Sequence, residues 1–133
     1  MLRLEIVAPE KKVVDAEVDS VTIPTASGEA GILPNHAPLI SALKPGILSF
    51  TSRGTTERIA IGGGFLEVSN DKVSVLADTA ERSTEIDVDA ARTKLQEAER
   101  AIAAAATSPI EETESLREQL ESADARLRLA AGR

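Results

Sequence analysis

Hydrophobic residues follow two different periods along this chain, and the change falls near residue 82. In the first part apolar and polar side chains alternate, as where Leu2, Leu4 and Ile6 are separated by charged residues. Alternation puts every second side chain on one face, which is typical of half-buried strands. Turn residues separate these runs at Pro9, Ser27-Gly28, Pro45-Gly46, Ser52-Arg53-Gly54 and Asn70-Asp71. The pattern predicts many short strands in a sandwich or flattened barrel.

The second period begins at Asp87, from where apolar residues recur every three or four positions. One stripe comprises Val88, Ala91, Leu95, Ala98, Ile102 and Ala105, and another comprises Thr113, Leu116, Leu120, Ala123, Leu127 and Ala130. Such stripes indicate amphipathic helices. Asp87 suits the first helix as its N-cap, and Pro109 ends that helix because proline cannot continue it. The sequence thus predicts an α+β chain, with a β-sandwich domain over residues 1–82 and an antiparallel helical hairpin over residues 83–133.

The predicted hairpin is weakly held together. Its first helix offers mostly alanine, and an alanine contact buries much less apolar area than a leucine contact. A helix pair of this kind is marginal without other packing. Two interpretations stay open at this point. Either the hairpin docks permanently on the β-domain and completes the fold, or it opens and wraps a partner.

Composition excludes several classes of function. The net charge is −7, so a nucleic-acid backbone or an anionic membrane surface would repel the chain. Phe50 and Phe65 are the only aromatic residues, which leaves little for base stacking. The chain has no cysteine and no apolar run near the ~20 residues of a membrane-spanning helix. We therefore expect no nucleic-acid partner, and membrane association only through a complex.

The motifs of common active sites are missing from the sequence. His36 is the only histidine, and catalysis or metal binding needs further groups beside it, so a contact role suits it better. The run Gly62-Gly63-Gly64 lacks the Lys-Ser/Thr of a phosphate-binding loop and leads into another strand pattern. It indicates a bulge or close backbone packing instead. We expect neither catalytic residues nor a metal site.

The loop of residues 28–39 is the most specific feature of the chain. Two glycines and two prolines bracket Ile32-Leu33 there, and this combination predicts a rigid projection rather than a strand. Rigid loops on a scaffold are common places for binding. Together with the run Gly62–Val68, this loop resembles the epsilon subunit of bacterial F-type ATP synthases. The order of the two hydrophobic periods agrees with that family.

The resemblance implies both a fold and a function. Members of the family have a flattened β-sandwich of about ten short strands followed by a two-helix hairpin. The implied function is that of a non-catalytic rotor subunit in the proton-translocating synthase, joining the gamma subunit to the c-subunit ring. The subunit would lie at the cytoplasmic face of the bacterial cell membrane. In this family the compact hairpin leaves catalysis free, whereas the extended hairpin inserts among the alpha, beta and gamma subunits and hinders ATP hydrolysis.

The resemblance also suggests which loop residues contact partners. Residues expected to face the c-ring and gamma are Glu29, Gly31, Ile32, Leu33 and His36. Glu29 would be a polar contact to the loops of the ring, and the apolar pair would anchor the projection. The alternative is that Glu29 and His36 are simply solvated.

Hairpin arginines are the second set of expected partner contacts. On the extended hairpin, Arg100 and Arg128, together with Arg92 and Arg126, would meet an acidic segment of a beta subunit. Their replacement by alanine should then relieve inhibition of hydrolysis.

Some family members bind ATP in the folded hairpin, and this chain retains part of their motif. Asp89, Arg92 and Arg126 match expected ligand positions, while Ser122 stands where another arginine would be. The missing cation should weaken phosphate binding, since charge-assisted hydrogen bonds are the strong ones. No cofactor is required, and ATP stays a candidate regulatory ligand.

Two other functions fit the same architecture. The chain could be a free-standing interaction adaptor, which would not co-purify with gamma and beta subunits. It could also be a stand-alone nucleotide sensor, which would need a pocket residue set that this sequence does not show.

Overall fold

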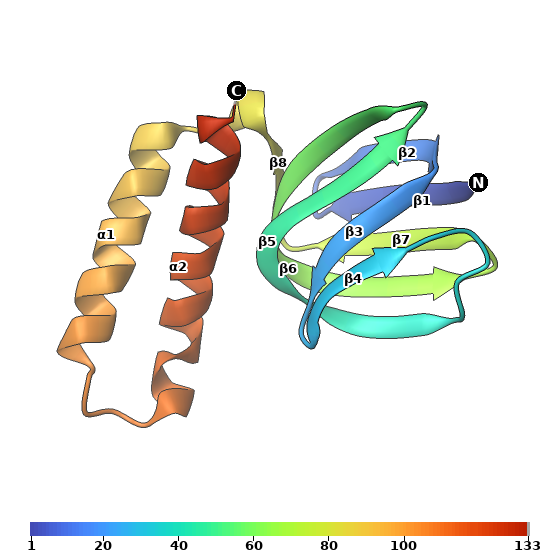
Figure 1. Cartoon of the computed structure of the whole chain (residues 1–133). Coiled ribbons are helices and arrows are strands. Elements are labelled where there is room, and N and C mark those ends of the chain that lie inside the picture. Colours follow the sequence, from blue (N-terminus) through green and yellow to red (C-terminus); the bar gives the residue numbers. More distant parts are fainter. Residues whose placement is uncertain (133) are drawn as a thin grey trace.

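The computed structural model describes residues 1–132 and places a β-domain beside a two-helix hairpin (Figure 1). The strands are β1 (Leu2–Ala8), β2 (Lys11–Val18), β3 (Ser20–Thr25), β4 (Gly28–Ile32), β5 (Leu39–Ser52), β6 (Thr55–Ser69), β7 (Lys72–Ala77) and β8 (Ala80–Arg82). A 3-10 turn (Ser83–Glu85) leads to the helices α1 (Val88–Ala104) and α2 (Ile110–Ala131). The fold class predicted from the sequence is confirmed.

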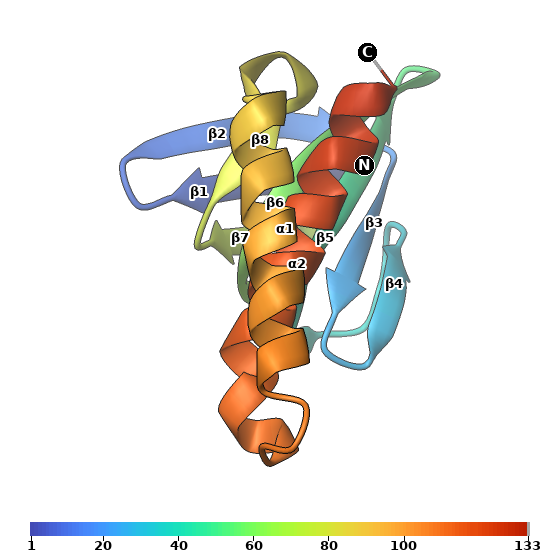
Figure 2. The same cartoon turned by 90° about the vertical axis from the view of Figure 1, so that its left-hand side faces the viewer.

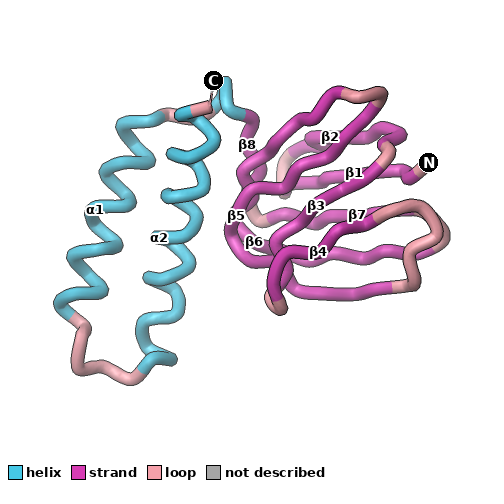
Figure 3. Tube along the Cα trace, in the orientation of Figure 1, coloured by secondary structure: helices cyan, strands magenta, loops and turns pink. Residues whose placement is uncertain are grey.

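The strands described for residues 1–132 form one sheet of eight that folds back on itself (Figure 3). Their order is β2-β1-β7-β6-β5-β3-β4, with β8 added to β6, and only β1 and β7 run parallel. The long strands β5 and β6 pair from Leu39↔Val68 to Ser52↔Thr55. Strand β6 pairs with β7 at one end and with β8 at the other. Eight strands, two of them long, therefore form the sandwich for which about ten short ones were expected.

Glycines in β6 allow the chain to approach its neighbours closely. Gly64 has a φ of 136°, and a Cβ atom there would overlap the backbone oxygen of Leu76. A Cβ atom at Gly62 would overlap the hydroxyl of Thr79. The prediction of close backbone packing is confirmed, because only glycine fits at such positions.

The core of the β-domain is aliphatic. In β1 the alternation is as predicted, with Leu2, Leu4 and Ile6 fully buried and Arg3 exposed. Other side chains less than 2% exposed come from six further strands and include Val18, Ile23, Ile32, Leu48, Ile59, Ile61, Leu66 and Val75. Burial of such side chains contributes about 1.5–3 kcal/mol each, so the β-domain has its own source of stability.

The sequence prediction was wrong for the first part of the loop of residues 28–39. Residues Gly28–Ile32 form the edge strand β4, which pairs with β3 from Thr25↔Gly28 to Val21↔Ile32. Gly28 has a φ of 122° where the chain leaves the turn after β3. Two glycines in five residues hid the alternation of Ala30 and Ile32, which turn toward the core. The projecting loop is confined to the residues between β4 and β5.

The two helices pack antiparallel, and α2 lies between α1 and the β-domain (Figures 1 and 2). Asp87 caps α1 as predicted, because its Oδ1 accepts the Ala90 N–H across 3.0 Å. In the seam the small Ala91, Ala98 and Ala123 are buried, while larger stripe residues, among them Leu95, Ile102, Leu116, Leu120 and Leu127, are only half-buried. The hairpin is thus as thinly packed as its alanine content predicts.

Candidate functional site

The loop that follows β4 lies beside the turn between β6 and β7. The backbone N–H of Asn35 donates to Asp71 Oδ1 across 2.6 Å, and the N–H of His36 donates to the oxygen of Leu33 across 3.2 Å. The His36 ring is half-buried, with Nδ1 2.7 Å from the oxygen of Ala37. Leu33 is 62% exposed. This end of the β-domain therefore presents an ordered loop with an apolar tip.

The predicted interface residues divide between surface and core. Glu29 and Gly31 are exposed on β4, and Leu33 and His36 belong to the ordered loop. Ile32 is fully buried, so its side chain belongs to the core and cannot anchor a contact with another protein. The register explains this placement, because Ile32 pairs with Val21, which is also in the core.

An exposed apolar patch, which the sequence pattern did not indicate, lies on the outer face of the sheet. Phe65 on β6 pairs with Leu76 on β7, and Ile40 on β5 pairs with Glu67, two residues beyond Phe65 on the same face. The three apolar side chains, Phe65, Leu76 and Ile40, are 63%, 60% and 78% exposed, respectively. We call Ile40, Phe65 and Leu76 the apolar patch. Contiguous apolar surface of this kind typically marks a protein interface.

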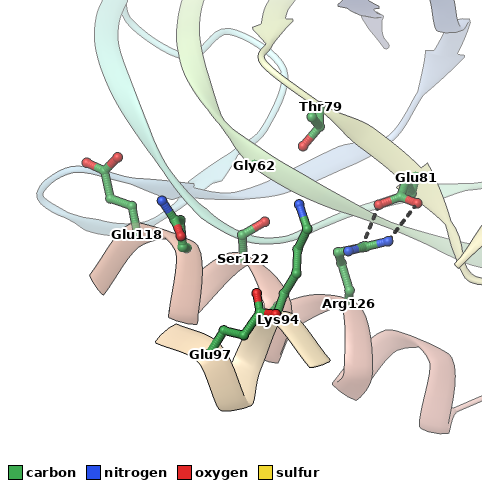
Figure 4. A pocket seen from close by; sticks show the side chains of 10 residues that line it. Gly62, Thr79, Glu81, Lys94, Glu97, Glu118, Ser122 and Arg126 are labelled. Carbon is green, nitrogen blue, oxygen red and sulfur yellow. Dashed lines mark hydrogen bonds and ion pairs between the residues drawn. The ribbon is translucent and has the colours of Figure 1, made fainter. Parts of the chain in front are cut away.

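A cavity of about 560 Å³ lies between parts of the hairpin and the β-domain (Figure 4). Its walls come from β6, the segment around β8, and both helices, and its charged lining residues are Glu81, Lys94, Glu97, Glu118 and Arg126. Lys94 extends from α1 toward the β-domain in Figure 4. Two cations thus face three carboxylates, so the cavity is polar without being strongly positive.

Arg126 closes one end of this cavity by pairing with Glu81. Its Nε lies 2.7 Å from Glu81 Oε1, and its Nη2 donates to Oε2 across 3.3 Å (Figure 4). The side chains are only 17% and 28% exposed. The Nε atom is buried, and its N–H does not point at a hydrogen-bond acceptor among residues 1–132. The pair therefore joins α2 to β8, although the buried Nε–H makes no hydrogen bond of good geometry with residues 1–132.

The other predicted ATP ligands lie outside the cavity. Asp89 and Arg92 pair with each other on the first turns of α1 across 3.6 Å, and their side chains are 96% and 59% exposed. The structure thus brings Arg126 to the cavity without them. It adds Glu81 and Lys94, neither of which is among the predicted ATP ligands.

The remaining hairpin arginines are on the surface. Arg100 is exposed on α1, and Arg128 is 59% exposed on α2, where its Nε donates to Asp124 Oδ2 across 2.9 Å. Both are accessible to a partner in the docked form of the hairpin.

No arrangement for catalysis is apparent among residues 1–132. His36 contacts a backbone oxygen rather than a nucleophile or a carboxylate. Within the same range, no cluster of three or more histidine, aspartate or glutamate side chains has the geometry of a metal site. None of the described helices is both long and apolar enough to cross a bilayer.

Sequence comparisons identify relatives over almost the whole chain. Residues 1–83 match the family described as ATP synthase, Delta/Epsilon chain, beta-sandwich domain. The ATP synthase epsilon chain of Carboxydothermus hydrogenoformans is 52% identical over 102 residues, which cover 77% of this chain and 76% of that protein. The ATP synthase epsilon chain of Gloeobacter violaceus is 47% identical over 131 residues, covering 97% and 96% of the two chains.

Solved structures with a similar fold come from ATP synthases. A chain in the Euglena gracilis mitochondrial ATP synthase (OSCP/F1/c-ring) superposes with a TM-score of 0.71 at 28% identity and covers 98% of this chain and 79% of that one. A chain in the central stalk/c-ring structure of the Tetrahymena thermophila mitochondrial enzyme has a TM-score of 0.61 at 14% identity, which supports the fold alone. These likenesses include the hairpin as well as the β-domain.

Proposed function

This chain belongs to the delta/epsilon chain family of ATP synthases, and from that membership we propose that it joins the gamma subunit to the c-ring in a proton-translocating F-type enzyme. It is a non-catalytic subunit of the central stalk. The relative that matches it over 97% of its length carries the proposal, because both the β-domain and the hairpin are then accounted for. Its place would be the cytoplasmic face of the bacterial cell membrane, reached only through the complex.

We assign the two exposed features of the β-domain to two partners. The apolar patch would pack on gamma, since burying Phe65, Leu76 and Ile40 supplies the apolar area that a stable interface needs. The ordered loop with Leu33 and His36, flanked by Glu29 on β4, would meet the polar loops of the ring. Polar contacts of this kind fix orientation more than affinity.

The proposal is tested by co-purification of the chain with gamma and with isolated c-rings. Phe65→Ser should reduce gamma binding by more than about tenfold, the effect of losing an aromatic anchor. Ile110→Ser is the matched control, because Ile110 is 72% exposed at the start of α2, away from the patch. Equal binding by the two variants would reject the patch as the gamma contact, and absence of binding by the wild-type chain would reject the function.

The hairpin would regulate hydrolysis by leaving its docked position and meeting alpha and beta subunits through Arg92, Arg100, Arg126 and Arg128. Its alanine seam supports this proposal, because a weakly packed element can have two arrangements close in free energy.

A crosslink can test the regulatory proposal. Because the chain lacks cysteine, Thr79→Cys with Ser122→Cys gives a unique pair, and both side chains lie within 4 Å of the point that a Cβ atom on Gly62 would occupy. Oxidation should hold the hairpin docked and abolish its inhibition of the reconstituted enzyme, and reduction should restore inhibition. Inhibition that persists in the oxidised form would contradict the proposal.

We propose ATP only as a weak regulatory ligand of the cavity. Arg126 and Lys94 could bind phosphates, but three carboxylates line the same walls, and Arg126 is already paired with Glu81. We therefore expect half-saturation in the millimolar range, about −4 kcal/mol. Calorimetric titration of the wild type, Arg126→Ala and the control Arg100→Ala checks this, and saturation at micromolar ATP would contradict it.

A further inference from the structure

Two tight turns in this chain share a backbone conformation but differ in the residues at their two central positions. The turn between β5 and β6 consists of Arg53-Gly54, and the turn between β6 and β7 consists of Asn70-Asp71. All four residues have positive φ, with values of 52°, 80°, 50° and 59°. Positive φ at both central positions is the mark of the type I′ hairpin turn, for which glycine is strongly favoured at the second position. Asp71 is therefore the exception that needs a reason.

The side chain of Asp71 holds the neighbouring loop. Its Oδ1 accepts the N–H of Asn35 across 2.6 Å, while its backbone oxygen accepts the N–H of Arg3 across 2.8 Å. Asn35 itself has a φ of 67°, a backbone conformation that needs support. One residue thus connects the loop after β4, the β6–β7 turn and the start of β1. Glycine would form the turn at least as well but could not bind the loop.

We propose that Asp71 is a positioning residue for the interaction surface at this end of the β-domain. Its carboxylate fixes Asn35, and with it Leu33 and His36 on either side, in the conformation that meets the c-ring. The proposal deepens the assignment of the loop to the ring and rests on it for the identity of the partner. Ordering the loop before contact reduces the entropy lost on binding.

The first test uses the isolated chain and is independent of the partner. Asp71→Gly creates the favoured Asn-Gly turn and removes the acceptor, whereas Asp71→Asn keeps an amide oxygen for Asn35. Exchange of the Asn35 amide, followed by NMR, should be about tenfold faster in Asp71→Gly than in the wild type. Asp71→Asn should stay close to the wild type. A melting temperature that is unchanged or raised in Asp71→Gly shows that the turn itself is intact.

The second test measures binding of these variants to isolated c-rings. Asp71→Gly should bind about tenfold more weakly than the wild type, and Asp71→Asn should restore most of the affinity. Asp19→Ala is the matched control, because Asp19 Oδ2 accepts the N–H of Arg53 across 3.1 Å at the other end of β6. It should leave ring binding unchanged.

The two tests fail in distinguishable ways. Unchanged exchange at Asn35 in Asp71→Gly would overturn the positioning role of Asp71 whatever the partner. Faster exchange with unaltered ring binding would overturn the link between loop order and recognition. A wild-type chain that does not bind the ring at all would instead reject the proposed function, while the exchange result still decides whether Asp71 holds the loop.

Discussion

The β-domain and the hairpin differ in what they bury. Buried side chains of the β-domain are mainly leucine, isoleucine and valine, whereas those of the helices are mainly alanine, with Leu129 the largest. Hydrophobic stabilisation follows the apolar area removed from water, so burial stabilises the β-domain more than it stabilises the hairpin. We therefore expect the β-domain to fold without the hairpin, whereas the hairpin depends on its contacts with the β-domain or a partner.

The apolar part of the joint between the two parts is small. A small cluster formed by Ala60, Ile86, Leu129 and Ala130 packs the C-terminal part of α2 on the β-domain, and the Arg126–Glu81 pair lies beside it. Toward the other end the hairpin projects away from the sheet (Figure 1). Elements held by so few apolar contacts open at low free energy. The joint is thus the place where the hairpin can separate without unfolding the β-domain.

Shortening a core side chain of the β-domain should have the largest effect. Leu48 is fully buried, and Leu48→Ala should reduce the free energy of unfolding by about 2–5 kcal/mol through lost transfer free energy and the cavity left behind. Urea denaturation followed by amide NMR measures this, because the chain has no tryptophan or tyrosine for fluorescence. The exposed Leu33→Ala serves as control. Equal stability of both variants would contradict an independent core.

Leu129→Ala should have a smaller and different effect. The side chain is 7% exposed, but the stability lost on shortening it cannot exceed the free energy of docking. Once the hairpin is undocked, Leu129 makes no further contact with the β-domain. We expect a cost of about 1–2 kcal/mol, expressed as faster amide exchange in the helices with unchanged exchange in β1, β6 and β7. Equal acceleration in the β-domain would show that the two parts unfold together.

The Arg126–Glu81 pair should contribute still less. Its partly buried position supports a coupling of about 1 kcal/mol in a double-mutant cycle with Glu81→Ala and Arg126→Ala, read from hairpin exchange. The exposed pair Arg128–Asp124 gives the comparison, with about 0.3–0.5 kcal/mol expected for a helical i,i+4 pair. A coupling no larger than this would leave the apolar cluster as the sole support of docking.

Regular patterns made much of the fold predictable. Alternation placed Leu2, Leu4 and Ile6 in the core, and the capping side chain of Asp87 marked the start of α1. Edge strand β4 was missed because glycine has no side chain to show alternation, and the unbroken lengths of β5 and β6 were missed because turn-like residues interrupt their patterns.

The candidate site was less predictable than the fold. Phe65 follows three glycines, so its pattern does not say which face of β6 it occupies, and only the register with Leu76 shows that it is exposed. Glu81 and Arg126 are 45 residues apart, and their pairing depends on how the hairpin docks. Contacts between elements distant in sequence depend on how those elements pack, and a local sequence pattern does not predict that packing.

Acid should weaken the joint through Glu85, with the smallest effect. The N–H of Arg82 donates to Glu85 Oε1 across 2.9 Å and Lys11 lies 3.1 Å from Oε2, and these contacts lower the pKa of Glu85 from its usual 4.5. A depressed folded-state pKa contributes stability above the unfolded value, and this contribution is lost as the pH falls through the folded value. The side chain is 39% exposed, so solvent screens most of the interaction.

The 3-10 turn that contains Glu85 connects β8 to α1, so its loosening should appear in the hairpin before the β-domain. Amide chemical shifts should therefore show a step in residues 86–91 of the wild type as the pH falls through the lowered pKa of Glu85, below 4.5. In Glu85→Gln, whose side chain at this position does not titrate, that step should be absent. Asp15→Asn is the matched comparison, because the hydrogen bond from Arg3 lowers the pKa of Asp15 on β2, far from the helices in sequence. If Asp15→Asn removed the step in residues 86–91 as Glu85→Gln does, acid would be loosening the whole molecule, and the joint would not open separately.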